Sequence, residues 1–176
     1  MPSGPFDGPL YRMPALTASF TIITPVALAI ASRAIRELRT IVASKVVFGS
    51  RKTARERSAV QAAVAEAEAM MRSARLLFYD ALATAWRRAV AHEPFSLEHT
   101  ADLMRVSTWA VRSAAQATDL MHRMGGTTGV YARSPLERCL RDAQTVRHHG
   151  FVAEGRLETV GQVYLDLAPD FTFVAF

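Results

Sequence analysis

Cysteine is almost missing from this chain, which has only Cys139 among its 176 residues. A single thiol excludes an internal disulfide and suits a reducing compartment, so we expect a cytoplasmic protein. No basic or metal-ligand cluster marks Cys139 as reactive, and we interpret it as a small buried apolar residue.

The usual signatures of phosphate, dinucleotide and metal sites are also missing. The sequence has no GxGxxG opening a βαβ unit, no GxxxxGK[ST], no HExxH and no CxxC. Its five histidines do not fall at metal-ligand spacings. The adjacent His148 and His149 would diverge by about 100° on a helix and are poorly placed to chelate one ion. We therefore expect no metal site.

Charge is missing from residues 14 to 32, a stretch about as long as a membrane span. The stretch contains Pro14, Pro25, three Thr and two Ser, and the first eight residues lack the basic start of a signal peptide. We interpret it as a core-facing helix with its lead-in, and a membrane span is the less favoured alternative.

Glycine and proline are few, at nine and eight, and they cluster at the ends and at interior breaks, whereas half of all residues are hydrophobic. Apolar residues recur at spacings of three and four, which predicts helices. The first begins between Ala15 and Pro25, with Pro25 after Thr24 as a good first-turn signature, and stops at Phe48. Further helices are predicted at about 56–92, 96–124, 135–149 and 157–165.

Three long helices with short connections and a shorter fourth predict an all-α fold. We expect an antiparallel four-helix bundle, up-down-up-down, with a short extra C-terminal helix. Residues 1–14 are interpreted as an extended lead-in, residues 15–165 as the bundle, and residues 166–176 as an apolar tail.

The chain is basic, with 21 Lys and Arg against 16 Asp and Glu. Such a balance suits nucleic acid, an anionic membrane or a phosphorylated cofactor. The arginines are spread along the predicted helices and not gathered into one run, which argues against a nucleic-acid partner. A mild arginine excess on a solvated surface is the plainer interpretation.

The most informative stretch runs from residue 124 to 149. It contains a Gly125-Gly126 turn, then Ser134-Pro135-Leu136-Glu137-Arg138, then Arg141-Asp142, then His149. In this combination the chain resembles the acyl-CoA dehydrogenase superfamily, in its type-2 C-terminal domain. That branch is shared with two-component flavin-dependent monooxygenases. Residues 8–14 look like the link that leaves the family's middle β domain, and the resemblance covers roughly residues 8 to 170.

The resemblance implies a flavin-dependent oxidoreductase that uses FAD or FMN and forms homotetramers through this bundle. In such enzymes the flavin lies between the bundle and a middle β domain. By this resemblance we expect the chain to be without the family's N-terminal and middle domains, and therefore to bind flavin weakly or not at all when alone. A homo-oligomer or a partner chain would supply the missing parts.

Four residues are assigned to the flavin site by the same resemblance. Phe48 is assigned because the pair Phe48-Gly49 resembles the family's flavin-contacting loop. Gly125 and Gly126 would contact the cofactor, because backbone without side chains can approach a pyrophosphate. His149 is the catalytic candidate, placed to assist proton transfer near the flavin ring. An ordinary helix stop at the glycines and a solvent-facing His149 are the alternatives.

Two further features bear on the chemistry. Arg141 and Asp142 lie four residues from Glu137 and Arg138, which favours structural salt bridges over a catalytic role. The region 148–155 lacks the Tyr-Glu-Gly-Thr segment that carries the catalytic Glu of common acyl-CoA dehydrogenases. This favours monooxygenase-like chemistry over α,β-dehydrogenation. The alternative function is a non-enzymatic helical oligomerisation module derived from such an enzyme, and a basic nucleic-acid binder is weaker still.

Overall fold

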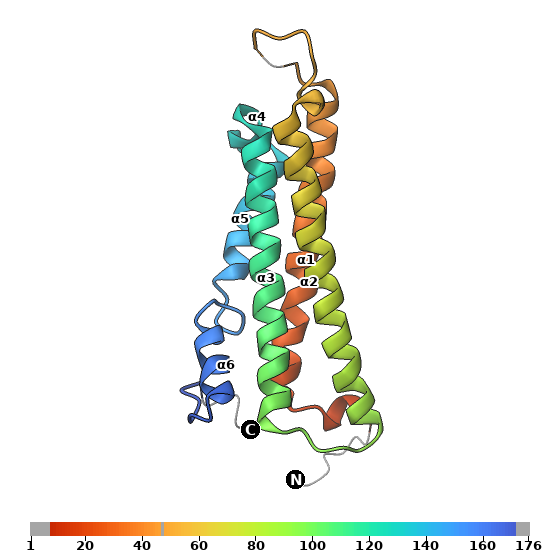
Figure 1. Cartoon of the computed structure of the whole chain (residues 1–176), viewed down its shortest axis with the longest axis vertical. Helices are drawn as coiled ribbons and strands as arrows, with labels where there is room; N and C mark the ends of the chain where they lie inside the picture. Colours follow the sequence, from red (N-terminus) through yellow and green to blue (C-terminus); the bar gives the residue numbers. More distant parts are fainter. Residues whose placement is uncertain (1–7, 47, 172–176) are drawn as a thin grey trace.

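The computed structural model describes residues 8–46 and 48–171, and these contain helices joined by short loops, with one isolated β-bridge between Val46 and Thr53. Figure 1 shows three long helices side by side, with a line of shorter ones along one flank. In chain order the elements are η1 (Pro9–Arg12), α1 (Ala15–Ser44), η2 (Ala54–Glu56), α2 (Ser58–Val90), α3 (Leu97–Gly125), α4 (Thr127–Val130), α5 (Pro135–Arg147) and α6 (Arg156–Tyr164).

The predicted all-α bundle is confirmed, with one refinement. The helices α1, α2 and α3 alternate in direction along the whole length of the molecule (Figure 1). The fourth position is shared by α5 and α6, which follow one another down the flank of α3. The short helix predicted at 157–165 is therefore the lower half of the fourth column.

The helix α1 does not start at Pro25, where the sequence has a first-turn signature. The helix begins at Ala15, and Pro25 lies inside it. Proline removes one backbone hydrogen bond from a helix interior. Buried side chains on both sides of the proline, Phe20 and Ala27 among them, hold the helix together by packing.

The apolar character of α1 follows from its place in the core. Residues Thr17–Ser44 are long and apolar enough to cross a membrane by length and composition, and an 18-residue window within them has a mean hydropathy of 1.6. However, 44% of that apolar window is buried inside the bundle. Alanines and leucines of this helix, such as Ala31 and Leu38, are completely enclosed by the other helices.

The core is built around α3, which packs against α1, α2, α5 and α6. One apolar face of α2 packs against α3. On this face Phe78, Ala74 and Ala67 are fully buried, whereas Val64 and Ala81 are only half-buried. Most buried positions of α3 carry Ala, Ser, Thr or Gly. Small side chains let neighbouring helices approach closely on several sides at once.

The lead-in is less extended than predicted, because Pro9–Arg12 forms a turn of 3-10 helix. Met13, which follows it, is buried against Ala85, Ala89 and Leu103. At the other end, Phe171 packs beside Phe20 and Val160, while residues 172–176 of the predicted tail lie outside the described residues.

A capping box begins α3 at Ser96, and its reciprocal partner is His99. The Ser96 hydroxyl accepts the His99 backbone N–H, and the His99 Nδ1 accepts the Ser96 backbone N–H at 3.0 Å. A neutral imidazole thus takes the place that Glu or Gln usually occupies.

Replacing Ser96 by Ala is expected to lower the free energy of unfolding by about 1 kcal/mol, because the first turn of α3 loses its side-chain acceptor. Urea denaturation followed by circular dichroism measures it. Ser73→Ala, at an exposed mid-helix position of α2, is the matched control and should leave stability unchanged or slightly higher. Equal stability of wild type and Ser96→Ala would contradict the capping role.

The Gly125-Gly126 turn ends α3 in a backbone conformation that favours glycine. Gly126 has φ +55° and ψ −142°, a combination close to a region that is essentially restricted to glycine. A Cβ on Gly125 would lie 2.7 Å from the Leu136 Cδ1, so the missing side chain lets α5 pack directly on the end of α3. The short helix α4, which the sequence did not predict, follows at once.

Gly126→Ala is therefore expected to cost about 1–3 kcal/mol of stability through backbone strain. Thermal and urea unfolding would both register the loss. Gly150→Ala is the control, since a Cβ there meets nothing within 4 Å and no positive φ is required. If the two alanine variants unfold alike, the strain argument at Gly126 is wrong.

Candidate functional site

A pocket of about 380 Å³ lies at the end of the bundle where α3 stops. It brings together Phe48 and Gly126, two of the residues predicted to contact a cofactor. Gly125 is the neighbour of Gly126 in the chain. The Gly125 carbonyl accepts a hydrogen bond at 2.8 Å from the Nζ of Lys45, which lines the pocket. The complete lining is Lys45, Val46, Phe48, Ala54, Arg57, Ala59, Val60, Arg123, Met124, Gly126 and Thr127.

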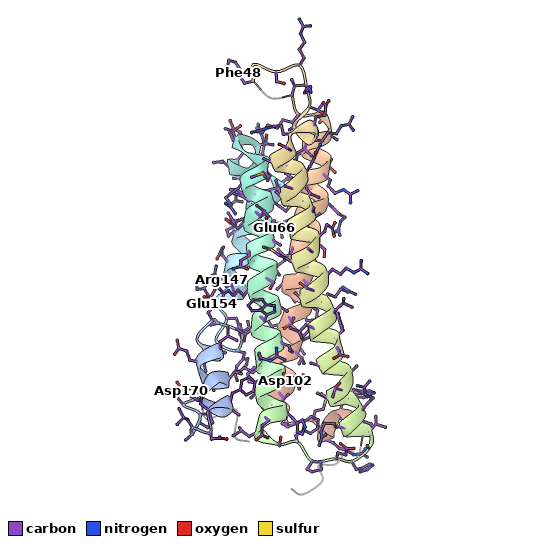
Figure 2. The ribbon with its side chains drawn as sticks, in the orientation of Figure 1. Phe48, Glu66, Asp102, Arg147, Glu154 and Asp170 are labelled. Carbon is purple, nitrogen blue, oxygen red and sulfur yellow. The ribbon has the colours of Figure 1, made fainter. Side chains whose placement is uncertain are left out.

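The loop between α1 and α2 forms one wall of this pocket and projects beyond the bundle. Figure 2 shows Phe48 on the projecting loop, and its side chain is fully exposed. The Ala54 N–H donates to the Lys45 carbonyl at 2.7 Å and closes the base of the loop. Phe48 therefore lies free of the chain's own core and available to a partner.

A second capping box fixes the end of that loop. Hydrogen bonds from the side chain and backbone of Thr53 hold the pKa of Glu56 below its usual value. These hydrogen bonds favour the carboxylate form of Glu56, and they use this side chain to hold the end of the loop.

Three cationic side chains line the pocket: Lys45, Arg57 and Arg123. Arg123 also pairs with Asp119 at 3.1 Å, on the exposed flank of α3. Residues 33–57 hold eight of the chain's 21 basic residues and two of its 16 acidic ones, so the positive charge of the molecule is concentrated at this end. Cations beside glycine backbone are a combination that suits a phosphate group.

His149 lies elsewhere, just beyond the end of α5. Its ring is exposed, and its Nδ1 accepts the Phe151 N–H at 3.3 Å. When the imidazole is neutral, this contact leaves the proton on the outward Nε2. The rings of His149 and Phe151 are 5.5 Å apart, and Phe151 in turn meets the buried Phe20 edge-on at 5.6 Å. The histidine is therefore anchored to the core although it faces outward.

The four predicted site residues do not form one cluster. The 13 residues of α5 separate the glycine turn from His149, a length of about 20 Å along the helix. Figure 1 shows α5 starting beside α4 and leading away from that end. The structure thus joins Phe48 with Gly126 and leaves His149 at a second place.

The other polar residues of the motif have structural roles. Arg138 pairs with Asp142, and Arg141 with Glu137, each at 3.5 Å across one helical turn, which confirms the salt-bridge interpretation. Glu154 pairs with Arg147 across the loop that follows α5 (Figure 2). That ion pair gives Glu154 a role in holding the loop.

The interpretation of Cys139 is also confirmed, and Gln61 lies apart from the pocket at the end of α3. Cys139 is buried, as predicted, and burial raises the pKa of its thiol. Gln61 donates to the Arg55 carbonyl at 3.1 Å and lines a different groove, between α1 and α2. Among residues 8–46 and 48–171, no three His, Cys, Asp or Glu side chains are grouped so as to hold a metal ion.

Sequence reasoning missed the three cations of the pocket. Lys45 precedes the Phe48-Gly49 pair by only three residues, and this proximity was the available signal. Arg57 and Arg123 carried no signal, because they come from the start of α2 and the end of α3 and meet only in the folded chain.

Comparison with known proteins bears on the family of the chain and on its fold. Residues 21–154 match the acyl-CoA dehydrogenase C-terminal domain family. Indole-3-acetate monooxygenase of Pseudomonas putida is 33% identical over 163 residues, which cover 93% of this chain and 42% of that protein. The chain therefore spans less than half the length of the curated relatives that it matches.

Solved structures show the same fold. XiaF from Streptomyces sp., solved with FADH2 and glycerol, superposes with a TM-score of 0.85 at 18% identity, covering 93% of this chain and 42% of XiaF. Butyryl-CoA dehydrogenase from Megasphaera elsdenii gives 0.71 at 22% identity, covering 89% of this chain and 38% of that enzyme. The helix order, the glycine turn and the family match lead to one conclusion: this chain belongs to the acyl-CoA dehydrogenase family and corresponds to its C-terminal helical domain.

Proposed function

We propose that the chain supplies the helical half of a flavin site in a monooxygenase-type oxidoreductase. The observation that carries this proposal is the pocket in which Phe48 and Gly126 lie among Lys45, Arg57 and Arg123. Its glycine backbone and its cations suit the phosphate of a flavin nucleotide, FAD or FMN. XiaF, the neighbour with FADH2, supports a flavin in preference to another phosphorylated cofactor.

The phosphate end fits this chain's own residues. A phosphate can approach the Gly126 backbone because no side chain blocks it, and the Lys45 ammonium is already oriented toward the turn by the Gly125 carbonyl. The Arg57 side chain would add a planar donor from the first turn of α2. When bound, the flavin would supply the redox chemistry, and these residues would hold and orient it.

His149 is proposed to act at the ring end of a flavin. Its outward Nε2–H can donate to a reacting oxygen, and its ring is held by Phe151. Because about 20 Å of helix separates it from the pocket, the two ends of one chain would serve either the two ends of one extended cofactor or two flavins in an oligomer.

Monooxygenase-like chemistry is preferred to acyl-CoA dehydrogenation for two reasons. The segment 148–155 lacks the Tyr-Glu-Gly-Thr signature, and Glu154 is paired with Arg147. The curated relatives are indole-3-acetate monooxygenases. We place the protein in the cytoplasm, where it would act as a homotetramer or with a chain that carries the remaining domains.

The second candidate function is a non-enzymatic oligomerisation module. Its support is the set of large apolar side chains exposed along α2, such as Leu76 and Trp86. A measurement of flavin binding by an assembly that contains this chain separates the two candidate functions. Binding favours the flavin-site domain, and no binding favours the oligomerisation module.

Arg57→Gln tests the phosphate pocket. In an assembly of this chain with the domains that its relatives carry beyond the match, the variant should weaken flavin binding about tenfold, because one charge-assisted contact is lost. Quenching of flavin fluorescence measures the dissociation constant. Arg36→Gln, on the exposed face of α1 and outside the pocket, is the matched control. Equal affinities for wild type and Arg57→Gln would remove the pocket from the flavin site.

His149→Gln tests the second end. The turnover number should fall by about 10²- to 10⁴-fold, since a positioned proton donor is lost, while flavin affinity stays the same. Single-turnover kinetics of flavin reoxidation follow it, with His148→Gln as the neighbouring control. Wild-type turnover in His149→Gln would favour the solvent-facing alternative.

A further inference from the structure

The helix α2 carries a second apolar stripe on the face opposite its buried one. Nine exposed positions follow a strict seven-residue repeat with spacings of three and four, and only one of them is charged. They are Ala62, Ala65, Ala69, Arg72, Leu76, Tyr79, Ala83, Trp86 and Val90. We call these nine residues the outer stripe.

Such a stripe is more than isolated exposed apolar residues. Leu76 is 63% exposed, and Trp86 and Val90 are 45% and 50% exposed. A repeat of exactly seven residues over four heptads is the pattern of a helix that packs against another helix in a left-handed pair. The outer stripe therefore predicts a helical partner that lies along α2.

Side-chain size along the outer stripe indicates the direction of that partner. The half near the start of α2 is small, with Ala62, Ala65 and Ala69, whereas the other half contains Leu76, Tyr79, Trp86 and Val90. A parallel copy of α2 would set alanine against alanine and leave a gap. An antiparallel copy sets large residues against small ones, and this fills the seam evenly.

Heptad geometry limits the antiparallel register. In such a pair the first apolar position of each heptad on one helix faces the fourth position of a heptad on the other helix. The numbers of two facing residues therefore add up to 148 in one register and to 155 in the other. With a sum of 155, Ala65 faces Val90, Ala69 faces Trp86, and Leu76 faces Tyr79 of the second helix.

Charge selects between the two registers. With the sum of 155, Glu66 comes beside Arg87 of the second copy on the same edge of the seam, whereas the sum of 148 sets Glu66 beside Asp80. Among the described contacts, Glu66 has no ion-pair partner, and Arg87 donates only to the Thr84 hydroxyl at 2.9 Å. Both charges are therefore available for a contact between copies.

We propose that the outer stripe of α2 pairs with the same stripe of a second copy, antiparallel, with Ala65 against Val90 and Glu66 beside Arg87. This rests on the proposed function in its oligomeric part and names the surface and register of the contact. A two-fold axis near residues 77 and 78 relates the two copies, so that every contact occurs twice.

Cysteine cross-linking of the full chain tests the register. In the variant Ala65→Cys/Val90→Cys both new thiols lie on exposed positions, so the fold is undisturbed. Mild oxidation should turn the protein into a covalent dimer, because residues 65 and 90 of different copies meet within disulfide reach. Within one helix they are about 37 Å apart, which prevents an internal bond.

The single variants Ala65→Cys and Val90→Cys are the controls, and neither should cross-link. Self-linking of Ala65→Cys would show a parallel pair and overturn the proposal. An uncross-linked double variant, or a wild-type chain that is monomeric by light scattering, would also overturn it and point to another domain as the cover of the stripe. Flavin binding by the assembled enzyme is measured in a separate experiment. Failure of the cross-link, or a monomeric wild-type chain, would therefore overturn the proposed contact without deciding the proposed flavin site.

Charge reversal provides an independent readout. Glu66→Arg should raise the dimer dissociation constant about tenfold, because two attractive pairs become repulsive. Glu66→Arg/Arg87→Glu should return it close to the wild-type value. Sedimentation equilibrium measures both, and a double variant as weak as Glu66→Arg would exclude this register.

Discussion

The structure depends above all on the enclosure of α3 by four other helices. Ala, Ser and Thr at most of its buried positions let α1, α2, α5 and α6 approach it from different sides. Because α3 is fixed along its whole length, the point at which it stops is also fixed. That point is Gly125, where the missing side chain admits Leu136 and brings α5 against the turn. The position of the basic pocket is thus a consequence of core packing.

Two separate ends follow from this arrangement, and each suits a different part of the proposed chemistry. The glycine turn, the projecting loop with Phe48 and the cations form a surface adapted to phosphate. His149 sits beyond α5 and is held by aromatic contacts to Phe20 through Phe151. Phe48 and His149 are both exposed, so the proposed flavin site requires further domains or further copies, in agreement with the share of its relatives that the chain spans.

Much of this could be predicted from the sequence, because periodicity and caps are local signals. The bounds of α2, α3 and α5 lie within about two residues of the expected ones, and the Gly-Gly stop was foreseen. The start of α1 at Ala15 lies within the predicted range, and only the first-turn signature at Pro25 was wrong, since packing around Phe20 and Ala27 overrides the local preference of proline for a first turn. Arg57 and Arg123 were missed because their proximity arises only from tertiary structure. The roles of His149, Phe48 and the glycines remain predictions.

The central claim is that the end of the bundle at Gly126 holds the phosphate of a flavin. A crystal structure of the flavin-loaded assembly, with this chain and the domains that its relatives carry beyond the match, tests that claim most directly. The account predicts a flavin phosphate oxygen within hydrogen-bonding distance, about 3 Å, of Lys45 or Arg57 and close to the Gly126 backbone. A flavin whose phosphates lie against other domains, with this pocket filled by solvent, would contradict it.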